Sequence, residues 1–117
     1  MRTLNFGTQN FTKVICKDDP SHGGACHEYE IQMSGGVNLP LADIEFQKGP
    51  VNENQLNGIF MEDLLVICID RLLHFQAGEY SCRENALALT KIQEAMHWLR
   101  HRTECRQKRG VEGTSQK

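Results

Sequence analysis

The chain has 117 residues, of which 39% are hydrophobic and 24% charged, and its formal net charge is −2. This length accommodates one domain with a modest core, and no apolar run approaches the roughly 18 residues that a membrane-spanning helix needs. The charge is uneven, because residues 100–117 hold six Lys and Arg against two Glu, which leaves −6 on the rest of the chain. A basic end of this kind favours a small anionic ligand over a nucleic-acid polymer, which would need a whole basic face.

The cysteines indicate a reducing compartment. There are five, an odd number, and the first residues lack the features of a signal peptide, so we expect free thiols in the cytosol. Cys68 lies in an apolar run and is predicted to be buried. Neither a metal nor a cofactor is predicted, because the spacing of the possible ligands in the first half fits no standard zinc pattern: Cys16, His22, Cys26 and His27.

The first half is predicted to form a small antiparallel sheet. Three short segments at residues 13–17, 27–33 and 42–47 alternate polar with apolar side chains and end at Pro or Gly clusters. The alternation places Tyr29, Ile31 and Met33 on one face, and turns Ile44 and Phe46 inward. Three strands need a cover to be stable.

The second half is predicted to supply that cover as an antiparallel helical hairpin. A polar linker at residues 52–58 precedes a first helix over 61–75, which is apolar around most of its circumference and has Glu62 and Asp63 in its first turn. After a short connection, Ser81 and Glu84 match a capping box, and a second helix continues to Gly110. The chain is therefore predicted to be one α+β domain, with a sheet part at 1–52, a hairpin at 59–110 and a tail at 111–117.

The length of the second helix indicates assembly. About 28 residues at ~1.5 Å each give roughly 42 Å, more than so small a sheet can cover. An apolar hairpin is a plausible symmetric interface, so we expect a homodimer. A hexamer built as a trimer of dimers stays open.

One sector of this helix combines an amide with guanidinium groups. Asn85 lies on the same side as Thr103, with Arg102 and Arg106 on the flank, where they are suited to paired hydrogen bonds with a phosphate. Asn85 and Arg102 are seventeen residues apart, roughly 25 Å along one helix, so they can share a small ligand only across an antiparallel dimer. The aromatic rings of Phe75 and Tyr80 either stack on a purine or plug the end of the hairpin.

Catalysis has little support in the sequence. No zincin, nucleophile-elbow, P-loop or dinucleotide-binding motif is present, and no nucleophile is paired with a base by spacing. We therefore predict a protein that is not an enzyme. Two alternatives to small-ligand binding stay open: RNA or DNA binding through the basic helix end, and an oligomeric module without a ligand.

Several segments resemble the phage Thoeris anti-defence sponge proteins. They are Asn-Gly-Ile-Phe-Met-Glu-Asp-Leu-Leu at 57–65, Cys-Arg-Glu-Asn-Ala-Leu-Ala at 82–88 and Arg-Gly-Val-Glu-Gly-Thr at 109–114, together with 27–31 and 46–50 in the sheet. The resemblance implies sequestration of cyclic ADP-ribose isomers without turnover, in the cytoplasm of the infected bacterial host. It also implies a hairpin shared with anti-CBASS sponges, and a separate site for cyclic di- or trinucleotides.

The resemblance further implies which residues bind the ligand. The family pattern of a hairpin-end aromatic, a helix-opening asparagine and two arginines matches Phe75, Asn85, Arg102 and Arg106. Phe75 would stack on adenine, Asn85 would bond a base or ribose edge, and the two arginines would neutralise the pyrophosphate. Arg109 and Thr114 are further candidates, for the same ligand or for the other class. The chain departs from the family at Phe60, where Thr or Ser is frequent before the first helix. Which cyclic isomer is preferred is not specified by these residue types.

Overall fold

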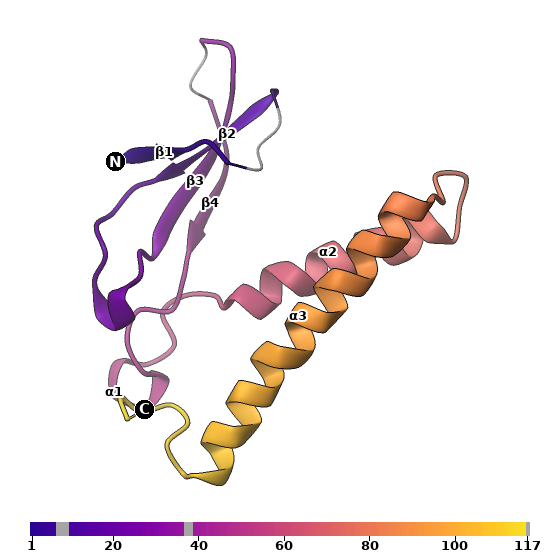
Figure 1. The fold of residues 1–117 in the computed structure, drawn as a ribbon. Coiled ribbons are helices and arrows are strands. Elements are labelled where there is room, and N and C mark those ends of the chain that lie inside the picture. Colours follow the sequence, from indigo (N-terminus) through magenta and orange to yellow (C-terminus); the bar gives the residue numbers. More distant parts are fainter. Residues whose placement is uncertain (7–9, 37–38, 117) are drawn as a thin grey trace. The chain divides into compact units, whose positions relative to one another are not determined.

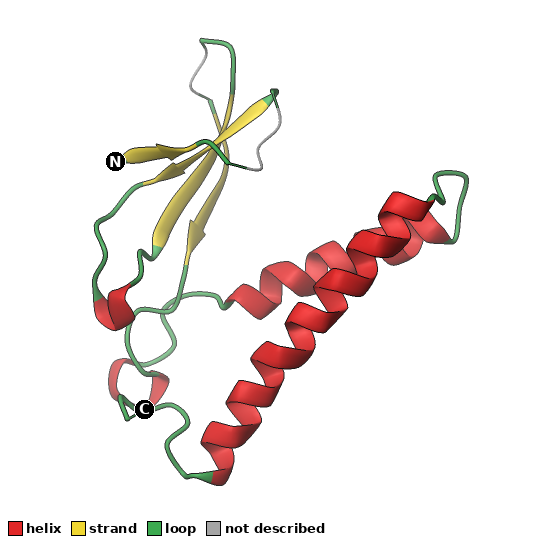
Figure 2. Cartoon of the chain, in the orientation of Figure 1, coloured by secondary structure: helices red, strands yellow, loops and turns green. Residues whose placement is uncertain are grey.

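A computed structural model describes residues 1–6, 10–36 and 39–116. The chain divides into two compact units, Met1–Ile59 and Phe60–Lys117. The first unit contains a four-stranded sheet and the second an antiparallel helical hairpin (Figures 1 and 2). The predicted α+β class, with an antiparallel sheet in the N-terminal half and a long last helix, is confirmed.

The sheet is an antiparallel meander in which neighbours in the chain are neighbours in space. Its order is β1 (Arg2–Leu4), β2 (Thr12–Cys16), β3 (Glu28–Met33) and β4 (Pro40–Glu45). The prediction of three strands was wrong by one, because β1 was missed. Three residues are too few for an alternating pattern to be recognised, and β1 is ordered by its pairing with β2, in which Arg2 lies opposite Cys16.

The predicted alternation of side chains in β3 and β4 agrees with their pairing. Val14 lies opposite Ile31, and Tyr29 lies opposite Ile44. The Tyr29 ring also meets the Phe46 ring edge to face, with centroids 5.7 Å apart. These side chains are half-buried, so the sheet has a thin apolar layer.

The segment after β4 is more structured than the predicted linker. It contains a single helical turn, α1 (Val51–Asn54), and Ile59 forms an isolated parallel bridge with Phe46. The backbone at Gly58 passes so close to Phe46 that a Cβ atom on Gly58 would lie 2.5 Å from the Phe46 carbonyl carbon. Only glycine fits this approach without movement of the backbone.

Substitution of Gly58 tests this close approach. We expect Gly58→Ala to lower the free energy of unfolding by about 1–3 kcal/mol, the usual cost of overpacking, because the obstructing atoms belong to the backbone. Urea unfolding followed by circular dichroism measures the change. Gly78→Ala is the matched control, since its new Cβ would meet its nearest atom at 3.6 Å. Equal stability of the two variants would contradict the packing seen here.

The two long helices agree with the predicted ranges to within about two residues at each end. They are α2 (Met61–Gln76) and α3 (Arg83–Lys108). The amide of Phe60 donates to the Asp63 carboxylate at 2.9 Å, which satisfies the start of α2 without Thr or Ser. The prediction of Ser81 as the cap of α3 was wrong: Cys82 is the cap, and its sulfur accepts from the Asn85 amide at 3.4 Å.

Neither helix contains a fully buried residue. The prediction of Cys68 in the core was wrong, since this side chain is exposed. Val66 and Ile67 are 56% and 57% exposed, because α3 covers only one side of a helix that is apolar on most sides. Among the described residues, no helix is both long and apolar enough to cross a membrane.

Candidate functional site

The partly buried residues of α3 follow a regular spacing of four and three positions. This spacing defines one continuous face that packs toward α2, and it comprises Asn85, Leu89, Ile92, Met96, Leu99, Thr103 and Arg106. Asn85 and Thr103 were predicted to share one side of the helix, and both belong to this face, as does Arg106, which was predicted on its flank. Arg102 lies beside this face and is exposed.

An aromatic cluster lies where α2 and α3 are joined. The Phe75 and Tyr80 rings meet edge to face with centroids 6.4 Å apart. The guanidinium carbon of Arg71 lies 5.4 Å from the centre of the Phe75 ring, within the range of a cation–π contact. Tyr80 is 74% exposed and Phe75 36%, so both rings pack on each other and still present surface to solvent.

Hydrogen bonds hold Asn85 beside this cluster. The side-chain amide of Gln76 closes the connection, because it donates to the Cys82 carbonyl and accepts from the Cys82 amide, both at 3.1 Å. The Asn85 amide group donates to the Tyr80 carbonyl at 3.2 Å. Among the described residues nothing donates to its side-chain oxygen, which is therefore available as an acceptor for a ligand.

The other end of α3 is organised around Arg106, whose side chain is only 11% exposed. Its guanidinium donates to the carbonyls of Val111, Thr114 and Gln116 at 2.9, 3.1 and 2.7 Å. It also pairs with the Glu112 carboxylate at 3.3 Å. Four of its five N–H groups are thus directed at the tail, which turns back through Gly110 at φ 73°. In this structure Arg106 orders the tail, including Thr114.

Removal of the Arg106 side chain should release the tail. We expect Arg106→Ala to increase amide hydrogen exchange at residues 111–116 by roughly tenfold or more, since each charge-assisted hydrogen bond contributes about 1.5–3 kcal/mol. Exchange near the middle of α3 should stay unchanged. Arg102→Ala is the control, because no described residue accepts a hydrogen bond from the Arg102 side chain. An equally protected tail in Arg106→Ala would show that the hydrogen bonds to this side chain are not what orders it.

The predicted site residues therefore fall into two groups. Phe75 and Asn85 lie together at the hairpin turn, whereas Arg106 and Thr114 lie together at the far end, where Arg102 and Arg109 are exposed. Asn85 and Arg102 belong to one continuous helix, so seventeen residues at ~1.5 Å separate them by roughly 25 Å. One chain does not bring the two groups into contact.

Two features of the hairpin were missed by sequence reasoning. Arg71 precedes Phe75 by four positions, a helical spacing that brings side chains together and could have signalled the contact. The second feature is an open groove of about 540 Å³ between α2 and α3, away from the hairpin turn. It is lined by Glu62, Asp63, Val66, Ile69, Met96, Arg100, Thr103, Glu104 and Gln107. The crossing of the two helices creates it, and no sequence motif marks it.

Comparison with known proteins identifies relatives of this hairpin. A family model described as the Acb2/Tad1 hairpin domain matches residues 39–104. A protein of Bacillus phage SBSphiJ7 named Thoeris anti-defense 1 is 53% identical over 77 residues, which cover 66% of this chain and 54% of the relative. The chain thus matches about half the length of that relative.

Proposed function

Because this chain belongs to the Acb2/Tad1 hairpin family, we propose that it sequesters cyclic ADP-ribose-type signals and thereby inhibits Thoeris defence in the bacterial host of a phage. The 53% identity to the protein named Thoeris anti-defense 1 carries this proposal. That name describes the relative, and a cyclic ADP-ribose-type ligand is what the resemblance to the sponge family implies for this chain. The hairpin carries groups that suit this ligand, since an aromatic ring can stack on adenine and guanidinium groups can pair with a pyrophosphate.

The hairpin turn would bind the base and ribose. Phe75 offers a ring for stacking, and its 36% exposure leaves part of that ring accessible. The Asn85 side-chain oxygen accepts a hydrogen bond while its amide stays on the Tyr80 carbonyl. Arg71, held over the Phe75 ring, adds positive charge to this end of the pocket.

The far end of α3 would bind the pyrophosphate. Arg102 is exposed and supplies planar N–H donors suited to phosphate oxygens. Arg106 adds charge and holds the tail, so that Thr114 and Arg109 stay at the same end of the helix. Arg109 and Thr114 are also candidates for contacts with a second ligand class, the cyclic di- or trinucleotides of CBASS defence.

A homodimer would join the two ends into one pocket. In an antiparallel pair, the Asn85 end of one α3 lies near the Arg102 end of the other. The exposed apolar side chains of α2, with Val66 and Ile67 more than half accessible, support an interface of this kind, since such surface is costly to leave in water. A hexamer of three such dimers remains compatible with the proposal.

Binding without turnover is the mode that the hairpin favours. Its one described thiol–imidazole contact joins Cys105 Sγ and His101 Nε2 at 3.6 Å. Both side chains are exposed on the surface of α3, where the backbone amides are engaged in helical hydrogen bonds and form no oxyanion hole. This pair therefore lacks the surroundings of a covalent catalyst.

The test is recovery of the bound nucleotide. Purified protein is incubated with a cyclic ADP-ribose isomer, freed of unbound nucleotide and heated, and the released material is identified by mass spectrometry. Intact cyclic nucleotide is expected, whereas absence of bound nucleotide or release of a hydrolysed product would refute sequestration. Parallel incubations with cyclic di- and trinucleotides test the second class. An affinity for RNA or DNA that decreases steeply with salt concentration and is unchanged in Asn85→Ala would favour the polymer-binding alternative.

A further inference from the structure

Three of the four buried side chains of the sheet unit carry groups that can bind a metal. Among the described residues of Met1–Ile59, four side chains are buried: Ile15, Cys16, Cys26 and His27. Cys16 is fully inaccessible. A unit of about 60 residues buries little apolar surface and is only marginally stable, and many small units gain stability from a disulfide or a structural metal. Thiols and an imidazole at the buried centre are the groups that such a link requires.

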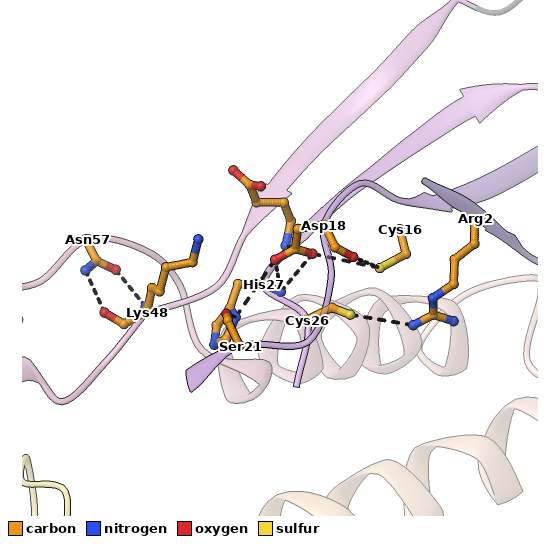
Figure 3. A network of polar contacts seen from close by, with 9 residues as sticks. Arg2, Cys16, Asp18, Ser21, Cys26, His27, Lys48 and Asn57 are labelled. Carbon is orange, nitrogen blue, oxygen red and sulfur yellow. Dashed lines mark hydrogen bonds and ion pairs between the residues drawn. The ribbon is translucent and has the colours of Figure 1, made fainter. Parts of the chain in front are cut away.

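The donor atoms of Cys16, Asp18 and Cys26 converge on one point at the end of β2. Their two sulfur atoms and a carboxylate oxygen all lie within 4.8 Å of one another, and Cys16 Sγ is 3.9 Å from Asp18 Oδ1 (Figure 3). Zinc–sulfur and zinc–oxygen bonds of about 2.3 and 2.1 Å, at a tetrahedral angle, would set these two atoms roughly 3.6 Å apart. This pair would have to shift by a few tenths of an ångström, and the other two pairs, which lie within 4.8 Å, by about 1 Å at most.

We propose that Cys16, Asp18 and Cys26 bind one Zn²⁺ ion, with water in the fourth position. The ion would tie the end of β2 to the loop before β3 and act as a structural link. The spacing of Cys16 and Cys26 in the sequence gave no indication of this site. It is the antiparallel pairing of β2 with β3, in which Cys16 lies opposite Tyr29, that brings the second cysteine back beside the first.

The surrounding groups orient two of the three ligands, Asp18 and Cys26, as outer-shell groups do in zinc sites. The Asp18 carboxylate accepts from the amide of His27 at 2.9 Å and from that of Glu28 at 3.1 Å. Burial would raise the pKa of the Asp18 carboxyl, but these hydrogen bonds outweigh it and the pKa is lowered. The guanidinium of Arg2 donates to Cys26 Sγ at 3.6 Å. Two thiolates and a carboxylate exceed the charge of Zn²⁺ by one, and Arg2 compensates that excess.

The competing interpretation is a disulfide between Cys16 and Cys26. Both cysteines are free in this structure. A disulfide would join only the two sulfur atoms and leave the Asp18 carboxylate unused, whereas a metal would bind this carboxylate as its third ligand. The convergence of three donor types thus favours the metal.

Cobalt substitution tests the proposal on the full chain. The protein is purified under reducing conditions, stripped with a chelator and titrated with Co²⁺. We expect one equivalent to produce thiolate-to-cobalt charge-transfer absorption and visible bands of a tetrahedral ion, and Zn²⁺ to abolish both. Absence of these bands in protein whose circular dichroism shows a folded sheet would overturn the proposal, as would a Cys16–Cys26 disulfide in the reduced preparation.

Matched variants locate the ion. Cys26→Ser should abolish the charge-transfer band, while Cys68→Ser, which alters an exposed thiol on α2, should preserve it. Loss of the Arg2 donor in Arg2→Ala should weaken metal affinity roughly 10- to 100-fold. A band retained in Cys26→Ser would overturn the assignment. The readout involves no nucleotide, so its failure would leave the proposed sequestration untouched.

Discussion

Replacement of Arg102 by alanine is expected to weaken binding of a cyclic ADP-ribose isomer by roughly 10- to 150-fold. This range corresponds to the loss of about 1.5–3 kcal/mol from a charge-assisted hydrogen bond to a phosphate. Because Arg102 is exposed and has no described hydrogen-bond acceptor within the chain, its removal should leave stability unchanged. Isothermal titration calorimetry measures the affinity, and thermal unfolding checks the fold.

The control for this experiment is Lys91→Ala. Lys91 is also an exposed cation of α3, and its ammonium lies 3.9 Å from Glu94 on the same helix, so its loss changes the net charge equally. We expect the affinity of Lys91→Ala to match that of the original protein. An equal decrease in both variants would indicate a nonspecific charge effect and contradict the role assigned to Arg102.

An acidic residue on the apolar side of α2 should prevent dimerisation. Val66 is 56% exposed in the single chain. If the dimer buries it, Val66→Asp would place an uncompensated carboxylate in the interface at a cost of about 3–5 kcal/mol. Dimer affinity should then fall by roughly two to three and a half orders of magnitude. Sedimentation equilibrium at several concentrations measures this change, and nucleotide binding should disappear together with the dimer.

Thr90→Asp provides the comparison for Val66→Asp. Thr90 is an exposed residue of α3 and lies outside the partly buried face defined above. An aspartate at this position should therefore be solvated. We expect this variant to remain a dimer that binds nucleotide. A monomeric original protein that nevertheless binds the nucleotide would exclude a pocket shared between subunits.

The helical hairpin was predictable because its signals are local. Apolar spacing near 3.6 residues, acidic residues at the start of α2 and a glycine after α3 each act within one or two turns. Gly110 indeed has a φ of 73°, a conformation that glycine adopts readily. The cap of α3 was assigned one residue too early, because Ser81 and Cys82 both precede the helix and only the observed geometry identifies the acceptor of the Asn85 amide.

For the candidate site, the sequence suggested which residue types are present, but it indicated their contacts only in part. The sequence indicated an aromatic and an amide at the hairpin turn, and the structure adds the contact of Arg71 with Phe75. The hydrogen bonds between Arg106 and the tail were not predicted. Their carbonyl acceptors on Val111 and Thr114 lie beyond the turn at Gly110, and residue spacing does not predict the path of the backbone through that turn. A pocket completed by a second subunit remains a proposal.

By itself, the sequence determined the α+β class, the two long helices and the family resemblance, because periodicity and short motifs depend on neighbours along the chain. Tertiary structure alone decided the pairing of β1, the convergence of Cys16, Asp18 and Cys26, and the groove between α2 and α3. Each of these depends on strand register or helix crossing, which join residues distant in sequence. Such contacts arise from the balance of packing and chain entropy over the whole unit, and no local pattern encodes them.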